Sequence, residues 1–276
     1  MTTARRFELP AAGVVLHRTT DSGCKYLLRL PVVPQSGAVP LVTVHGISRN
    51  AHEHATRLSD IAERAGALLV APIFGRERRG YQRLRDAERQ IATDLDLIEA
   101  LRLAAAETGA DTSKVNLLGF SGGGQFAHRF ALIHPARIAR LATVAAGWYT
   151  FPDTATAYPF GVAPATDTPL EPDIGGLLRI PTLVAVGTRD TERDRSLRKG
   201  RRIDRIQGRD RVERARRWVD SMRRTARLTG APPAVMLEML PRTGHSFAEA
   251  MGRGGLESLA LEFFYGRLRG RRTAHR

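Results

Sequence analysis

Short runs of apolar and β-branched residues alternate along this chain with longer segments whose apolar residues recur at helical spacing. The runs predict strands over residues 13–17, 25–30, 39–45, 67–71, 115–119, 141–146, 182–186 and 234–240. The first two are expected to form an antiparallel pair, and Pro72 is expected to end the strand over 67–71. Helices are expected over 53–65, 91–109, after Ser121, over 209–228 and over 256–268. Because strands alternating with helices form a mostly parallel sheet covered on both faces, the expected fold class is α/β.

The length of the chain is suited to one domain. It has 276 residues, of which 42% are hydrophobic, enough for a sizeable core. No apolar run approaches the roughly 20 residues that a membrane-spanning helix needs. Residues 1–10 carry basic side chains without the apolar segment that is typical of a signal peptide. We therefore expect a single domain over 1–276, located in the cytoplasm, and the only cysteine, Cys24, excludes an internal disulfide.

The chain is strongly basic, with a formal net charge of +15 that comes almost entirely from arginine. The arginines concentrate between residues 189 and 227 and in a basic tail over 267–276. A charge of this size attracts anionic surfaces or substrates. No nucleic-acid reader motif accompanies it, and only 6% of the residues are aromatic, so we favour a solvated basic face and expect no specific nucleic-acid partner.

The segment over 147–178 interrupts the alternation of strands and helices, because it is rich in proline and in aromatic residues. Long irregular connections in compact domains are usually lids or binding loops, although an ordinary packed excursion explains the composition equally well. Its position after the carboxyl end of a strand favours a lid, since ligands bind at that edge of an open α/β sheet.

The pentapeptide Gly119-Phe120-Ser121-Gly122-Gly123 fits the pattern G-x-S-x-G in its required context, between an apolar strand and an amphipathic helix. A sharp strand-to-helix turn crowds the residues beside the serine, which explains the glycines. Such a turn exposes the Ser121 hydroxyl and places the Gly122 N–H at a helix N-terminus, where developing negative charge is stabilised. The pattern predicts that Ser121 is a nucleophile.

A serine hydroxyl needs a general base, and histidine has the most suitable unperturbed pKa near neutrality. Among the eight histidines, His245 lies just after the last predicted strand, at the same sheet edge as Ser121. An acid must then orient the imidazole, and Asp190 directly follows a strand at that edge. Asp194 is the main competitor, and the sequence leaves the choice between the two open.

The oxyanion hole and the substrate pocket have candidates at the same edge. In His45-Gly46-Ile47 the glycine allows close approach of the backbone, so the N–H of Ile47 is expected to be the second oxyanion donor beside that of Gly122. His45 itself is interpreted as a histidine that closes the strand. The candidates for the pocket wall are all aromatic: Phe74, Tyr81, Phe120, Trp148 and Tyr149.

Four motifs together resemble the α/β-hydrolase superfamily over nearly the whole chain, from about Gly13 to Leu268: His45-Gly46, Gly119–Gly123, Gly187–Asp190 and Gly244-His245. The resemblance implies a central, mainly parallel eight-stranded sheet with a lid after the sixth strand. A narrower similarity, over residues 45–50 and 71–74, is to bacterial esterases of the polyhydroxybutyrate-depolymerase and feruloyl-esterase kind.

The expected function is that of a serine hydrolase that cleaves a small or medium carboxylic ester through an acyl-enzyme. A serine peptidase or amidase of the same fold uses the same side chains, so it remains an alternative. A binding protein with a degenerate hydrolase fold and a basic surface is the alternative outside enzymes. No cofactor is expected, and no metal, because Cys, His and Asp do not cluster at metal-ligand spacing. The oligomeric state is left open.

Overall fold

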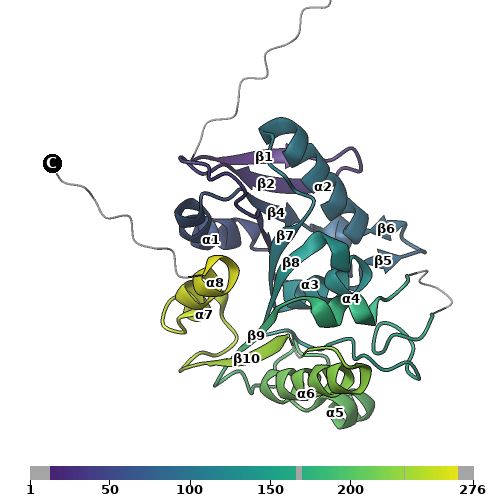
Figure 1. Cartoon of the computed structure of the whole chain (residues 1–276). Coiled ribbons are helices and arrows are strands. Elements are labelled where there is room, and N and C mark those ends of the chain that lie inside the picture. The colour runs from purple at the N-terminus through teal and green to yellow at the C-terminus, as the bar shows by residue number, and fades with distance from the viewer. Residues whose placement is uncertain (1–12, 166–169, 233, 267–276) are drawn as a thin grey trace, which may run out of the picture.

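The computed structural model describes residues 13–165, 170–232 and 234–266. Eight strands form the central sheet in the order β1-β2-β4-β3-β7-β8-β9-β10 (Figure 1). In chain order these strands are Val15–Thr19, Lys25–Arg29, Leu41–Val44, Leu69–Ile73, Val115–Phe120, Ile138–Val144, Thr182–Gly187 and Val235–Leu240. The pairs β1/β2 and β2/β4 are antiparallel, and every other pair in this sheet is parallel. The predicted α/β class and the mostly parallel eight-stranded sheet are therefore confirmed.

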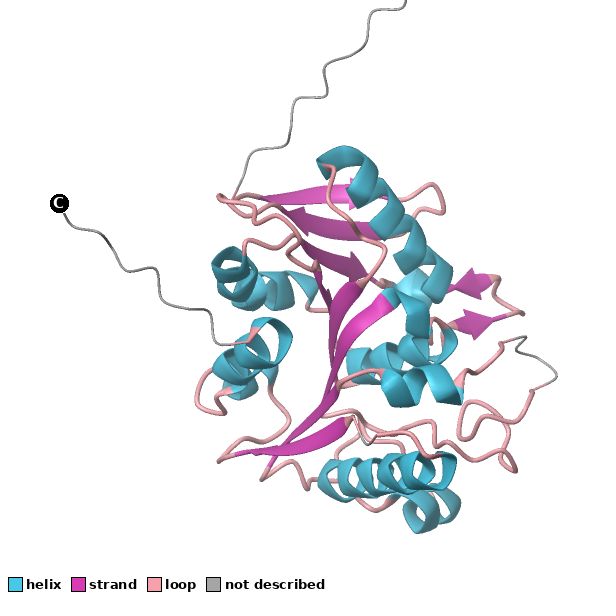
Figure 2. Ribbon diagram, in the orientation of Figure 1, coloured by secondary structure: helices cyan, strands magenta, loops and turns pink. Residues whose placement is uncertain are grey.

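Helices cover both faces of the sheet (Figure 2). Three of them pack on one face: α1 (Ala51–Ala65), α7 (Phe247–Met251) and α8 (Leu256–Tyr265). Four pack on the other: α2 (Thr93–Thr108), α3 (Gly122–Ile133), α4 (Ile174–Arg179) and α6 (Arg211–Thr229). A short helix, α5 (Arg201–Gln207), lies beside α6, and a two-stranded ribbon, β5 (Arg85–Asp86) with β6 (Ile91–Ala92), lies apart from the main sheet.

Alternating side chains of the central strands supply the two cores. In β9, Leu183 and Ala185 face the α1/α7/α8 layer, whereas Val184 and Val186 face the opposite layer. A strand with helices on both faces buries both sets of side chains, so it is a continuous apolar run rather than an alternating pattern. This burial explains why the apolar runs are reliable indicators of the strands.

The fourth strand differs from its prediction, because β4 continues through Pro72 to Ile73. Strand β3 pairs with β4 only at Leu69 and Val70, so no β3 partner faces Pro72. Proline lacks the N–H of a sheet hydrogen bond, and it is tolerated where that hydrogen bond is not required. The prediction that Pro72 ends the strand is therefore wrong.

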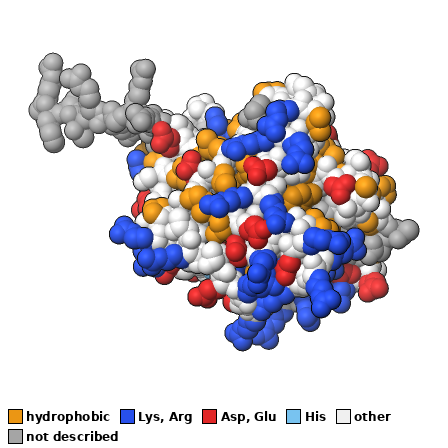
Figure 3. Space-filling model, turned by 90° about the horizontal axis from the view of Figure 1, so that it is seen from below, with side chains coloured by type: hydrophobic (Ala, Val, Ile, Leu, Met, Phe, Trp, Pro, Cys, Tyr) orange, Lys and Arg blue, Asp and Glu red, His pale blue; other side chains and the backbone are white. Residues whose placement is uncertain are grey.

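Basic side chains gather on the surface of α5, α6 and the loop before them. Figure 3 views the molecule from this side and shows Lys and Arg side chains spread over it, with apolar side chains between them. The exposed basic residues of this region include Arg195, Arg198, Lys199, Arg201, Arg202, Arg205, Arg216, Arg224 and Arg227. The predicted basic tail over 267–276 lies outside the described residues. No helix in the described ranges is long and apolar enough to cross a membrane.

Candidate active site

Ser121 occupies the sharp turn between β7 and α3. Its backbone has φ 55° and ψ −113°, a positive-φ conformation that L-residues adopt at an energetic cost. The flanking glycines allow the turn to be this tight. A methyl group on Gly123 would lie 1.9 Å from the Val44 carbonyl oxygen, and one on Gly119 would lie 2.1 Å from the Gly123 oxygen. Backbone therefore packs against backbone on both sides of Ser121.

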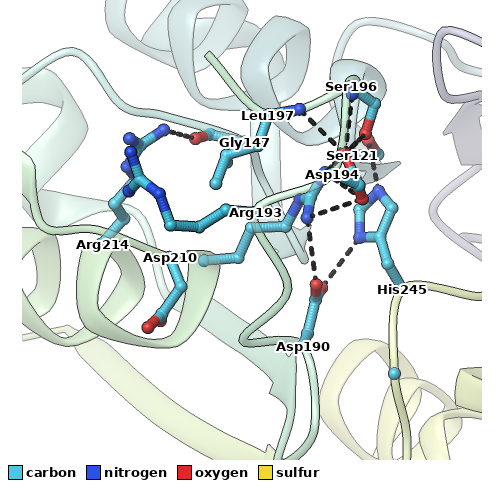
Figure 4. Close-up of polar contacts among 12 residues, drawn as sticks. Ser121, Gly147, Asp190, Arg193, Asp194, Ser196, Leu197, Asp210, Arg214 and His245 are labelled. Carbon is cyan, nitrogen blue, oxygen red and sulfur yellow. Dashed lines mark hydrogen bonds and ion pairs between the residues drawn. The ribbon is translucent and has the colours of Figure 1, made fainter. Parts of the chain in front are cut away.

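The structure brings Ser121, His245 and Asp190 into one hydrogen-bonded chain (Figure 4). His245 Nε2 lies 2.9 Å from Ser121 Oγ, and His245 Nδ1 lies 2.8 Å from Asp190 Oδ2. With the imidazole proton on Nδ1, the ring donates to the carboxylate and accepts the hydroxyl proton of Ser121 at Nε2. Ser121 and Asp190 are buried, with 6% and 1% of their surfaces exposed, so water competes little for these hydrogen bonds.

Three strands converge to place these side chains. Ser121 follows β7, Asp190 follows β9 and His245 follows β10, and their carboxyl ends lie at one edge of the sheet because the strands are parallel. The loops after β9 and β10 are joined by a backbone hydrogen bond of 2.9 Å from Arg189 N to the Thr243 oxygen. A Cβ on Gly187 would lie 2.2 Å from that same oxygen, so the glycine permits this contact.

The two candidate acids have different hydrogen-bond partners. Asp190 contacts His245, whereas the Asp194 carboxylate accepts hydrogen bonds from Ser196 and from the Leu197 N–H. Burial opposes ionisation of Asp194, but the Ser196 hydrogen bond and the charge of Arg211 outweigh it and hold the pKa of Asp194 below its usual range. The Asp194 carboxylate therefore stabilises the conformation of its own loop.

Arg211 joins the two carboxylates, and no pattern in the sequence distinguishes it from the other arginines of its helix. It is 1% exposed, and its Nη1 donates to Asp190 Oδ1 at 3.2 Å. Its Nη2 donates to Ser196 Oγ at 2.6 Å, and the guanidinium lies 3.4 Å from Asp194. Arg211 therefore holds the Asp190 carboxylate on the side opposite His245 and ties it to the loop over 190–200.

The two candidate oxyanion donors lie close together. A Cβ on Gly122 would lie 3.3 Å from the Ile47 nitrogen, so the backbone of the β3–α1 loop approaches the start of α3. His45 shapes this loop: its Nδ1 contacts the Gly46 oxygen at 2.7 Å, and its Nε2 accepts from Phe74 N at 3.0 Å. Burial lowers the pKa of His45 to about 4, so the ring is neutral near pH 7. A neutral ring leaves Nε2 free to accept the hydrogen bond from Phe74 N.

A cavity of about 330 Å³ lies beside Ser121 and His245. Of the five aromatic wall candidates, Phe120 lines it and stacks on the His245 ring at a centroid distance of 5.2 Å. Its other lining residues have polar and apolar side chains in nearly equal numbers: Gly46, Ile47, Ser48, Asn50, Glu53, Ser196, Ser246, Phe247 and Ala248. The cavity is therefore less aromatic than the predicted pocket.

The structure places the other four wall candidates away from this cavity. Phe74 and Tyr81 are buried in the core, and the Tyr81 hydroxyl donates to the His45 oxygen at 2.7 Å. Trp148 packs against Phe160, and Tyr149 stacks on Trp218. The sequence could not distinguish these positions, since an aromatic residue near a strand end serves equally well as core.

The described residues 147–165 and 170–173 of the segment over 147–178 are irregular, as its prolines predict. None of its described residues lines the cavity beside Ser121. Its first residues are hydrogen-bonded to α5 and α6. The Gln207 side chain accepts from the N–H of Tyr149 and donates to the Tyr149 oxygen, and Trp218 Nε1 donates to the Thr150 oxygen. A lid function for this segment stays a prediction.

Gly123→Ala is expected to lower the free energy of unfolding by about 3 kcal/mol and the Tm by roughly 6 to 12 °C. The added methyl group meets the backbone carbonyl of Val44, and neither a rotamer change nor a flexible neighbour relieves that contact. Thermal unfolding measures the effect. Gly175→Ala is the matched control, because its methyl group would meet side-chain atoms at an ordinary 3.6 Å. Equal Tm values for the two variants would contradict the described packing at the turn.

Comparisons with known proteins support the architecture. No protein-family model matches the sequence, and no curated protein matches it. Among solved structures, a poly(3-hydroxybutyrate) depolymerase from Bordetella parapertussis is 25% identical, with a TM-score of 0.77 and coverage of 96% of this chain and 93% of that one. A poly(aspartic acid) hydrolase from Sphingomonas sp. KT-1 is 24% identical, with a TM-score of 0.76 and coverage of 91% and 97%.

An S-formylglutathione hydrolase from Agrobacterium tumefaciens is more distant, at 18% identity and a TM-score of 0.57, with coverage of 91% of this chain and 94% of that one. These likenesses extend over nearly the whole chain, and the chain has the α/β-hydrolase fold, as its four motifs imply. The neighbours are hydrolases, which supports a hydrolytic enzyme.

Proposed function

We propose that this protein is a serine hydrolase that cleaves a carboxylic ester through an acyl-enzyme intermediate. The hydrogen-bonded chain from Ser121 through His245 to Asp190 is the observation that carries the proposal. Nucleophile, base and orienting acid within hydrogen-bond reach are the arrangement that acyl transfer needs. Cys24 offers no alternative nucleophile, because burial raises the pKa of its thiol to about 12.

The mechanism follows from the positions of these groups. Ser121 Oγ attacks the ester carbonyl while His245 Nε2 takes its proton, and the ion pair with Asp190 stabilises the imidazolium that forms. The negative charge on the carbonyl oxygen is stabilised by the N–H groups of Ile47 and Gly122. His245 then protonates the leaving alcohol and activates the water that releases the acid. These steps use only side chains and backbone of this chain.

Polar side chains in the cavity wall favour a substrate with hydrogen-bonding groups near the cleaved bond. Asn50 and Glu53 line it, as does the exposed Ser196. Poly(3-hydroxybutyrate), in the name of one structural neighbour, is a polyester, which is compatible with cleavage of a carboxylic ester, and the name of another contains poly(aspartic acid). Because poly(aspartic acid) is an amino-acid polymer, an amidase is the second candidate function.

Labelling with a fluorophosphonate probe tests the proposal without knowledge of the substrate. We expect the full-length protein to be labelled, and Ser121→Ala to abolish the label. Ser196→Ala is the matched control, since Ser196 lines the same cavity without contacting His245, and it should keep the label. An unlabelled, folded wild-type protein would contradict the proposal and favour a binding protein with a degenerate hydrolase fold. A matched pair of ester and amide substrates then separates the two enzyme candidates.

A further inference from the structure

A second cavity, of about 370 Å³, lies between the segment after β8 and the helix α5. It shares no lining residue with the cavity beside Ser121. Its volume is within the range of roughly 300–1,000 Å³ that is typical of small-molecule sites. The cavity therefore has the size of a binding site, and the mechanism proposed above makes no use of it.

Apolar side chains from both elements form part of its wall. Phe151 and Phe160 come from the segment after β8, and Ile203 and Ile206 come from α5. Ile206 is 43% exposed, although a large aliphatic side chain gains free energy by leaving water. A ligand with an apolar body would cover this surface.

Basic side chains form another part of the wall: Arg198, Lys199, Arg201 and Arg202. Within the ranges that the structure describes, none of these four forms an ion pair. The lining carboxylate, Asp153, accepts hydrogen bonds from Thr156 Oγ1 and Ala155 N instead. The positive charge at this cavity is therefore not balanced locally, which favours an anionic ligand.

Arg198 is held in place before any ligand binds. Its guanidinium carbon lies 5.4 Å from the centre of the Trp148 ring and 5.0 Å from that of Phe160. Arginine over an aromatic face is attracted by the ring and loses rotational freedom. A preordered guanidinium binds a carboxylate with less loss of entropy, and its planar fork matches the two carboxylate oxygens.

We propose that this cavity is a binding site for a small amphipathic carboxylate. The apolar body of the ligand packs on Phe151, Phe160 and Ile206, and its carboxylate pairs with Arg198 and with the basic pair Arg201 and Arg202. Binding of this kind requires no reaction at Ser121. The proposed binding site is therefore independent of the proposed hydrolase function, and an experiment that contradicts one proposal leaves the other unaffected.

Calorimetric titration of the full-length Ser121→Ala protein with octanoate tests the proposal, and the substitution prevents any turnover from contributing heat. We expect saturable binding of octanoate and binding of the neutral octanamide at least about tenfold weaker, since the neutral amide loses the charge-assisted hydrogen bonds to the basic side chains. Equal affinity for the two compounds would overturn the anionic character of the site, and no binding of octanoate would overturn the site itself.

Two matched pairs of variants locate the binding. Arg201→Gln with Arg202→Gln should weaken octanoate binding by about tenfold, whereas Arg216→Gln with Arg224→Gln removes the same charge from α6, outside the cavity, and should leave it within about twofold. Equal losses would show diffuse attraction to the basic surface and overturn the proposal.

Ile206→Glu, on an exposed side chain of the cavity, should abolish binding. Leu228→Glu, on the 81% exposed Leu228 of α6, should have no effect. Octanoate binding that survives Ile206→Glu would place the ligand elsewhere and overturn the proposal. Far-ultraviolet circular dichroism verifies that each variant is folded.

Discussion

Ser121→Ala is expected to lower kcat for ester hydrolysis by about 10⁵- to 10⁶-fold, and His245→Ala by a similar factor. The two side chains share one hydrogen bond, of 2.9 Å, and act on one proton. Once either is removed, the other has no function left in the chemical step. The double variant should therefore be no slower than the slower single variant, a non-additivity that steady-state kinetics on the three proteins measures directly.

A folding control distinguishes a loss of catalytic rate from a loss of folded protein in these variants. Ser121 is buried at the start of α3, so circular dichroism and the Tm of each variant should be compared with those of the wild type. We expect small changes, because alanine retains the Cβ of Ser121. Rate losses that multiply in the double variant would show that Ser121 and His245 act independently, which would contradict the proposed mechanism.

Asp190→Asn is expected to lower kcat by about 10⁴-fold, because an amide supports the wrong tautomer of His245 and carries no charge to stabilise the imidazolium. The substitution also leaves the buried Arg211 facing a neutral amide at a distance of 3.2 Å. We therefore expect a lower Tm as well, since the buried guanidinium then keeps only the more distant Asp194 as a carboxylate partner. Steady-state kinetics and thermal unfolding of the same sample measure the two effects.

Asp194→Asn is the matched control, with the same change of charge four residues along the same loop. Asp194 contacts Ser196, Leu197 and Arg211 and makes no contact with His245. We expect at most about a tenfold loss of kcat, because the Ser121–His245–Asp190 chain stays complete. A loss in Asp194→Asn that equals or exceeds that of Asp190→Asn would assign the acid to Asp194.

The strands and the turn at Ser121 were predictable because their causes are local. Apolar runs such as 115–119 indicate buried strands, and the glycines around Ser121 indicate a turn in which side chains would clash with backbone. Gly66 and Gly109 likewise end their helices in the left-handed conformation. The short helices α4, α5 and α7 escaped prediction, since five to seven residues are too few for a periodic pattern.

Which of the two candidate acids contacts His245 depends on tertiary structure. Asp190 and Asp194 both follow the same strand, so no local pattern separates them. The distance to His245, which is 55 residues further along the chain, does separate them. Arg211 escaped prediction for the same reason, because it differs from its neighbouring arginines only in being buried against Asp190.

Patterns in the sequence were enough to predict a mostly parallel sheet covered by helices, with a serine, a histidine and an acid following strands at one edge of it. Periodicity, glycine positions and strand order carry this information, because each acts over a few residues or through the rule that parallel strands end together. The same patterns do not indicate which aromatic side chains line the cavity, which carboxylate contacts His245 or which basic residues surround the second cavity. These outcomes depend on how side chains distant in sequence share the space between elements, and no pattern within a single segment records that packing.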